Sequence, residues 1–169
     1  MAEWKVQTSR VGLQPIAETS TTKKVPLGTI VTAVHESTTG STTYGSGEFI
    51  YLLGVADTAI GTWVTYNADD GSTTRLAANA FGPVAVAMSA NVASQYGWYQ
   101  ISGKALGLAL ADFANDGRVY ATATAGSVDD TVVDGDMVHL AKGASTIVGA
   151  GLAEFEIHRP YMDDIAGND

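Results

Sequence analysis

The fold class is indicated most clearly by residues 95–103, which read QYGWYQISG. Successive side chains of an extended chain point to opposite sides, so Trp98, Gln100 and Ser102 fall on one side and the residues between them on the other. Aromatic and β-branched residues favour such a conformation. Gly97 lies between two large aromatic residues, where a missing side chain lets a neighbour approach closely or permits a bulge. The segment therefore predicts a β-strand with two different faces.

Strand-like segments recur on both sides of this stretch, separated by glycine, aspartate and serine turn signals. The turn at 69–72, which reads DDGS, predicts a hairpin between its flanking strands. Residues 84–88 fit a buried strand or a short helix, and in 106–110 leucines alternate with small residues. The predicted segments are 29–34, 48–53, 62–67, 73–76, 84–88, 95–103, 106–110, 118–124, 137–140, 147–151 and 154–158. Helical periodicity is nearly absent, which predicts an all-β fold, an antiparallel sandwich or barrel of about nine to ten short strands.

The chain divides into three parts by composition. Residues 1–28 carry spaced apolar residues that fit no helix for long, so they predict an extended N-terminal arm. Residues 29–160 form the β-domain, and 161–169 predict a loose acidic C-terminal tail. An arm of this kind lies on a neighbouring molecule or is a frayed terminus, and the two alternatives are equally compatible with the sequence. In the first case its interface residues are Trp4, Val6, Val11 and Leu13.

Composition excludes several classes of protein. Hydrophobic residues make up 46% of the 169, enough for a core, whereas charged residues are only 16%, against roughly 25% in ordinary domains. The net charge of −9, with nine scattered Lys and Arg, argues against nucleic-acid binding, which needs a basic stripe. There is no cysteine. No apolar run reaches the roughly 20 residues of a membrane span, and the first residues predict no signal peptide. We expect synthesis in a cytoplasm and no membrane association.

The residues that could carry chemistry do not form a recognisable constellation. His35, His139 and His158 are isolated and lack metal-ligand spacing. The acidic cluster at 129–136 (Asp129, Asp130, Asp134 and Asp136) breaks the calcium-loop pattern with Thr131-Val132-Val133, so a polar loop with an Asp-Gly turn is the favoured interpretation. No nucleophile elbow and no phosphate loop is present. We therefore predict no catalytic residues, no metal and no cofactor.

The large aromatic residues allow two interpretations. Trp63, Tyr96, Trp98 and Tyr99 lie in patterned strands, which favours anchors of the core or of an interface. Together with Tyr66 they could instead form a platform on which a carbohydrate stacks. The first interpretation is favoured because a platform for ligands is more often built from loops.

Several short sequence motifs resemble those of a family of small virion proteins of tailed bacteriophages. Residues 81–88 (FGPVAVAM) precede 94–103 (SQYGWYQISG), and 120–126 (YATATAG) and 134–136 (DGD) follow in a compatible order. The similarity spans 61–151 and is moderately specific, with 81–83 departing from the glycine-led opening of that family.

The resemblance implies a non-enzymatic head decoration, or cement, protein on the outer capsid surface of the virion. Its expected partners are the major capsid protein and copies of itself, as a homotrimer, and its expected effect is stabilisation of the assembled capsid. Two alternatives stay open at this point. One is a tail or head-fibre module that binds a host receptor or glycan, and the other is a small hydrolase.

Overall fold

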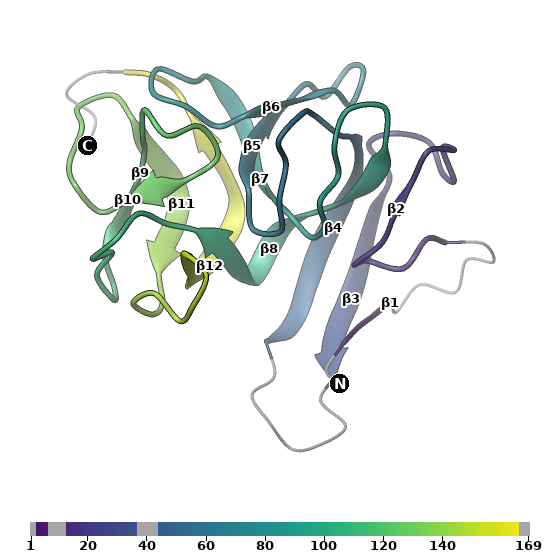
Figure 1. Cartoon of the computed structure of the whole chain (residues 1–169), viewed down its shortest axis with the longest axis horizontal. Coiled ribbons are helices and arrows are strands. Elements are labelled where there is room, and N and C mark those ends of the chain that lie inside the picture. Colours follow the sequence, from purple (N-terminus) through teal and green to yellow (C-terminus); the bar gives the residue numbers. More distant parts are fainter. Residues whose placement is uncertain (1–2, 7–12, 37–43, 166–169) are drawn as a thin grey trace.

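The computed structural model describes residues 3–6, 13–36 and 44–165. Within these ranges the chain forms twelve β-strands and no helix (Figure 1). The strands are β1 Glu3–Val6, β2 Thr19–Ser20, β3 Ile30–Glu36, β4 Gly45–Leu53, β5 Trp63–Tyr66, β6 Thr73–Arg75, β7 Gly82–Ala87, β8 Tyr96–Leu108, β9 Arg118–Ala121, β10 Val128–Asp129, β11 Met137–Gly143 and β12 Leu152–Met162. The described part of the chain contains no helix that is long and apolar enough to cross a membrane.

All twelve strands belong to one antiparallel sheet. Its order is β1-β3-β4-β8-β7-β12-β11-β9-β10, while β5 joins β7 and carries β6, and β2 joins β8. In Figure 1, β1–β4 lie on one side of the molecule and β9–β12 on the other, with β5–β7 between them. The predicted all-β antiparallel class is confirmed. Of the two arrangements that the sequence left open, the closed barrel is not formed, because the sheet order ends at β1 and β10.

Strand β8 connects the two halves of this sheet, because it pairs with β4 on one side and with β12 on the other. Its first half pairs with β4, from Leu53↔Tyr96 to Glu48↔Ser102, and its second half pairs with β12 up to Leu152↔Leu108. The sequence predicted two strands here, at 95–103 and 106–110. They are one strand because Gly103 takes a φ of 100° and continues the ladder through a conformation that glycine adopts readily. A side chain at Gly103 would meet the Ser46 carbonyl oxygen at 2.5 Å.

The two faces predicted for residues 95–103 are confirmed. Trp98 belongs to a cluster between β3, β4, β8 and the N-terminal segment, whereas Tyr99 and Ile101 belong to a second cluster beneath β5 and β7. Gly97 lets Asn91 approach, since a Cβ there would lie 3.0 Å from the Asn91 Cγ atom. A third and larger cluster fills the space enclosed by β5 and β7–β12. Its buried members are Trp63, Leu76, Val84, Val86, Ala105, Ala109, Phe113, Val119, Ala121, Val128, Val138, Ala153, Phe155, Ile157 and Met162.

Several local predictions can be compared with the strands directly. The hairpin at 69–72 is confirmed, because β5 and β6 pair from Val64↔Arg75 to Tyr66↔Thr73 and Gly71 has a φ of 69°. Residues 84–88 are a strand rather than a helix, within β7. The segment 147–151 is not a strand; it holds one bridge, Gly149↔Leu152, in the turn before β12.

Both predicted terminal segments contribute residues to the folded sheet. In the segment predicted as an arm, β1 pairs with β3 of the same chain, and Ile16 is only 2% exposed. The carbonyl oxygen of Gln14 accepts a hydrogen bond from Trp98 Nε1 at 2.8 Å. At the other end β12 runs two residues into the segment predicted as a tail, where Met162 is buried in the large cluster.

Candidate interaction surface

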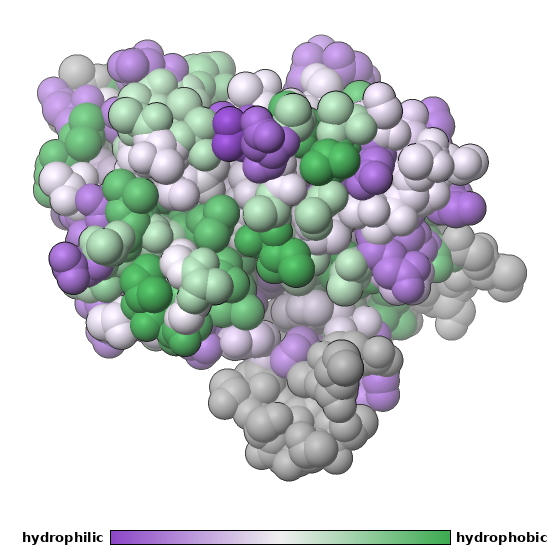
Figure 2. Space-filling view, in the orientation of Figure 1, coloured by the Kyte–Doolittle hydropathy of each residue, from purple (hydrophilic) through white to green (hydrophobic). Residues whose placement is uncertain are grey.

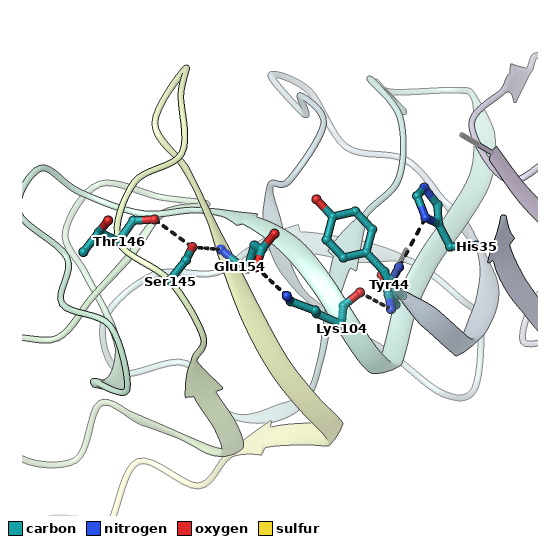
Figure 3. Close-up of polar contacts among 7 residues, drawn as sticks. His35, Tyr44, Lys104, Ser145, Thr146 and Glu154 are labelled. Atoms are coloured by element: carbon teal, nitrogen blue, oxygen red, sulfur yellow. Dashed lines mark hydrogen bonds and ion pairs between the residues drawn. The ribbon is translucent and has the colours of Figure 1, made fainter. Parts of the chain in front are cut away.

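A polar cluster joins the start of β4 to the β8–β12 ladder (Figure 3). Glu154 on β12 lies 2.5 Å from Lys104 Nζ on β8, and its carboxylate is close enough to the Tyr44 hydroxyl to affect the pKa of that group. Lys104 Nζ lies 5.5 Å from the centroid of the Tyr44 ring. Behind them Ser145 accepts the Glu154 backbone N–H at 2.9 Å. Lys104 and the Glu154 carboxylate therefore face each other as opposite charges.

The electrostatics of this cluster favour a structural role. Burial and the neighbouring Glu154 carboxylate raise the pKa of Tyr44 above its usual value, so its hydroxyl keeps its proton and donates at neutral pH. The Lys104 ammonium and the Glu154 carboxylate neutralise one another, and their ion pair joins β8 to β12. The cluster ties the β3–β4 hairpin to β12 across the bend in β8.

The three histidines lie apart, in different surroundings. His35 is 9% exposed, its ring lies between Trp4 and Tyr44, and burial lowers its pKa. His139 stacks on Tyr161 with ring centroids 4.9 Å apart. His158 is exposed on β12. Among the described residues no three His, Cys, Asp or Glu side chains gather as metal ligands would.

Two carboxylates of the 129–136 cluster hold neighbouring loops. Asp136 is 4% exposed and accepts the Asn79 backbone N–H at 2.5 Å. Asp130 accepts the Ala114 backbone N–H at 3.1 Å. Both contacts fit the favoured interpretation of this segment as a polar loop rather than a calcium loop.

The four aromatic residues named from the sequence are divided among the three clusters. Trp63 lies edge-on to Phe155 at 4.9 Å in the large cluster, and Trp98 contacts Tyr51 at 5.0 Å. The Tyr99 hydroxyl accepts a hydrogen bond from Asn91 Nδ2 at 3.0 Å. Trp63, Trp98 and Tyr99 are fully buried, whereas Tyr96 is partly exposed and stacks on Tyr51. The structure does not bring them together on one surface.

The predicted interface residues of the arm contact the chain's own third cluster. Trp4 packs edge-on to Phe49 at 4.8 Å, and Val6 and Leu13 contact the same cluster. All three remain partly exposed. Val11 lies outside the described residues. Trp4, Val6 and Leu13 therefore pack on the cluster formed by β3, β4 and β8 of their own chain.

The sequence reasoning missed an apolar surface on the outer face of the β8–β12 ladder. We define it by five residues, Ile60, Leu106, Leu108, Val148 and Leu152. Ile60 is 56% exposed and Val148 is 59% exposed, and the three leucines are partly exposed. In Figure 2 apolar side chains gather over the part of the molecule where β8 and β12 lie.

Backbone pairing places these five residues side by side. Leu108 pairs directly with Leu152 across β8 and β12. The Leu108 N–H donates to the carbonyl of Gly61, next to Ile60, and the Val148 N–H donates to the carbonyl of Leu152, both at 2.8 Å. The five therefore form one continuous surface.

The leucines face outward because the small residues between them are needed inside. A Cβ at Gly107 would lie 2.5 Å from Trp63 Nε1 and 3.0 Å from Phe155 Cε2. Ala105 and Ala109 share this inward side and are buried. The alternation of leucine with glycine and alanine was visible in the sequence, and it was the signal that could have revealed the surface.

Comparisons with protein-family models, with curated proteins and with solved structures find no significant match to this chain. The features of the chain that bear on its function are consequently the surfaces described above and the sequence motifs in residues 61–151.

Proposed function

We propose that this protein is a non-enzymatic structural protein of a tailed-bacteriophage head, a decoration protein that binds the outer surface of the capsid and stabilises it. The observation that carries the proposal is the apolar surface of Ile60, Leu106, Leu108, Val148 and Leu152. Isolated proteins rarely leave several apolar side chains contiguous and exposed, and such surfaces mark sites of association.

The charge distribution of the chain supports association through this surface. The chain carries a net charge of −9, which opposes contact between copies, so a surface through which copies meet must itself be free of charge. None of the five residues of the apolar surface is charged, and the charges of this face are paired nearby in the Lys104–Glu154 contact. A partner that buries the five residues gains hydrophobic free energy, at about 25 cal/mol per Å² of apolar area, without burying an unpaired charge.

Stabilisation of a capsid then follows from mass action. A protein that binds only the assembled shell lowers the free energy of that shell relative to its dissociated subunits. The partners that we propose are the major capsid protein and further copies of this chain, arranged as a trimer, on the outer surface of the virion.

Co-sedimentation with capsids tests the proposal. Purified protein is mixed with immature and expanded capsids of the encoding phage, and bound protein is quantified after centrifugation. We expect saturable binding to expanded capsids, loss of binding in Ile60→Asp and Val148→Asp, and full binding in Thr32→Asp, an exposed position on β3. All four proteins must show the same thermal unfolding. Absence of binding to either capsid form would refute the proposal.

A further inference from the structure

A hollow of about 400 Å³ lies where the β5–β6 hairpin separates from the start of β7. Strands β5 and β7 pair from Trp63↔Val86 to Thr65↔Val84, and the register ends there. The next residue on β7 is Pro83, which has no N–H to donate to the ladder, and it faces Tyr161 of β12 instead. Gly82, with a φ of 117°, turns the chain away. The opening is therefore a consequence of the local sequence.

The lining of this hollow combines hydrogen-bonding groups with an exposed ring. Hydroxyl or amide groups are supplied by Thr65, Tyr66, Asn67, Ser72 and Thr74. Phe81 also lines it and is 77% exposed. None of the lining residues, which all lie within 65–83, is charged at neutral pH. Burial raises the pKa of Tyr66, so its phenol keeps its proton.

The hairpin wall of the hollow is held in place before any ligand arrives. Asn67 Oδ1 accepts the Asp69 N–H and Asp70 Oδ1 accepts the Ser72 N–H, each at 2.8 Å. The backbone of Asn67 bonds both Ser72 and Gly71 at 2.9 Å. Because the Asn67 oxygen is already used, its NH₂ group is left to donate toward a ligand. A wall of this rigidity limits the entropy lost on binding.

A row of rings extends from the hollow across the sheet. Tyr66 and Pro83 line the hollow, Pro83 pairs with Tyr161, and Tyr161 pairs with His139. Tyr161 is 42% exposed, and its ring is nearly parallel to that of His139, at 20°. Both residues point away from the large cluster, which takes Met162 and Val138 from the alternate positions. The row provides flat surface beyond the hollow itself.

We propose that this hollow binds a neutral carbohydrate, with the Phe81 ring stacked on the apolar face of a sugar and the hydroxyl and amide groups bonding its hydroxyls. A sugar offers donors, acceptors and a face of C–H groups at once, and this lining supplies the complement of each. A phosphate or carboxylate ligand would find no cation among the lining residues, and Arg159, whose charge acts on Tyr66, is already paired with Glu48. The volume lies at the small end of ligand sites, which suits a mono- or disaccharide. This inference goes beyond the proposed capsid binding and does not depend on it.

Saturation-transfer NMR with the full chain provides the test. The probes are glucose, galactose, mannose and N-acetylglucosamine with their disaccharides, and glucuronic acid is the charged counterpart of glucose. We expect saturable binding of at least one neutral sugar and weaker binding of glucuronic acid. Phe81→Ala should reduce affinity by about tenfold, and Thr74→Val should reduce it by less.

A matched control separates the site from the general surface. Val132→Ala truncates a side chain that is 67% exposed and lies outside the hollow, and it should leave sugar affinity unchanged. No saturable binding of any neutral sugar would overturn the proposal, as would equal loss in Phe81→Ala and Val132→Ala, or a preference for glucuronic acid. Phe81→Ala should still bind capsids, so failure of sugar binding and failure of capsid binding are distinguishable.

Discussion

Truncation of Trp98 tests the packing of the N-terminal segment most directly. The Trp98 side chain is fully buried, lies against Tyr51 and donates its indole N–H to the carbonyl of Gln14. Replacement by alanine removes the whole indole ring and leaves the Gln14 carbonyl without its Trp98 donor. Large-to-small changes of this kind cost about 3–5 kcal/mol. In a chain of this size we expect the melting temperature to fall by about 10 °C.

Trp98→Phe separates the two contributions. It keeps a ring in the cluster but removes the N–H, so the expected loss is about 1–2 kcal/mol from the unsatisfied carbonyl together with slightly poorer packing. In both variants the Trp98–Gln14 bond is gone, which leaves the β2–β8 pairing and the bond from Gln14 Nε2 to the Tyr96 carbonyl to hold the N-terminal segment on β8. Protease cleavage around Ile16, which is 2% exposed in the intact protein, should therefore become faster before the rest of the chain unfolds.

The assay is denaturant unfolding followed by fluorescence and circular dichroism, with limited proteolysis under native conditions. Phe81→Ala is the control, because it truncates an aromatic ring that is 77% exposed and should change stability by less than about 0.5 kcal/mol. Equal stability of Trp98→Ala and Phe81→Ala would refute the packing argument. Loss of stability without faster cleavage near Ile16 would show that the N-terminal segment is not held by this bond.

Three further predictions follow from particular contacts. Gly107→Ala should lower the free energy of unfolding by about 1–3 kcal/mol through overpacking, since its Cβ would lie 2.5 Å from Trp63 Nε1; an unchanged denaturation midpoint would contradict this. Burial lowers the pKa of His35, so the unfolded chain binds more protons just below its own pKa of about 6.5. Stability should then fall as pH decreases from about 7 toward the folded pKa, and unfolding curves of His35→Phe should lose that part of the pH dependence. Removal of residues 1–12 should leave a folded protein, whereas removal of 1–28 also deletes Gln14 and Ile16 and should abolish the cooperative unfolding transition in calorimetry.

Local chemistry accounts for the parts of the fold that the sequence predicted. The turn at 69–72 needs a residue with positive φ, which Gly71 supplies at 69°, and the flanking strands then pair in the only register that the turn allows. The alternation in 95–103 assigns Trp98 and Tyr99 to opposite faces, as found. Both predictions concern residues that are close together in the sequence, and the pattern of side chains along the chain is sufficient to make them.

Prediction of the candidate surfaces would have required knowledge of contacts between residues that are far apart in the sequence. The sequence marked large aromatic residues as anchors of the core or of an interface without deciding between the two, and the structure buries Trp63, Trp98 and Tyr99 in its clusters. The apolar residues that remain exposed include Ile60 and Val148, in loops without periodicity, and the aromatic residues Phe81 and Tyr161. The hollow joins 65–74 to 81–83 only because Pro83 ends the pairing of β5 with β7.

The amino-acid sequence by itself determined the all-β class, the strand at 95–103 with its two faces, and the hairpin at 69–72, because each depends on side chains a few positions apart. Only the tertiary structure decided which side of each strand faces the core. In β8 the leucines point outward and Gly107 points inward, since Trp63 and Phe155 from other strands occupy the interior. Hydrophobicity favours burial of every apolar side chain, but the interior volume is limited and close-packed. Because the rings of Trp63 on β5 and Phe155 on β12 fill the space beside β8, only a residue without a large side chain, such as Gly107, fits there.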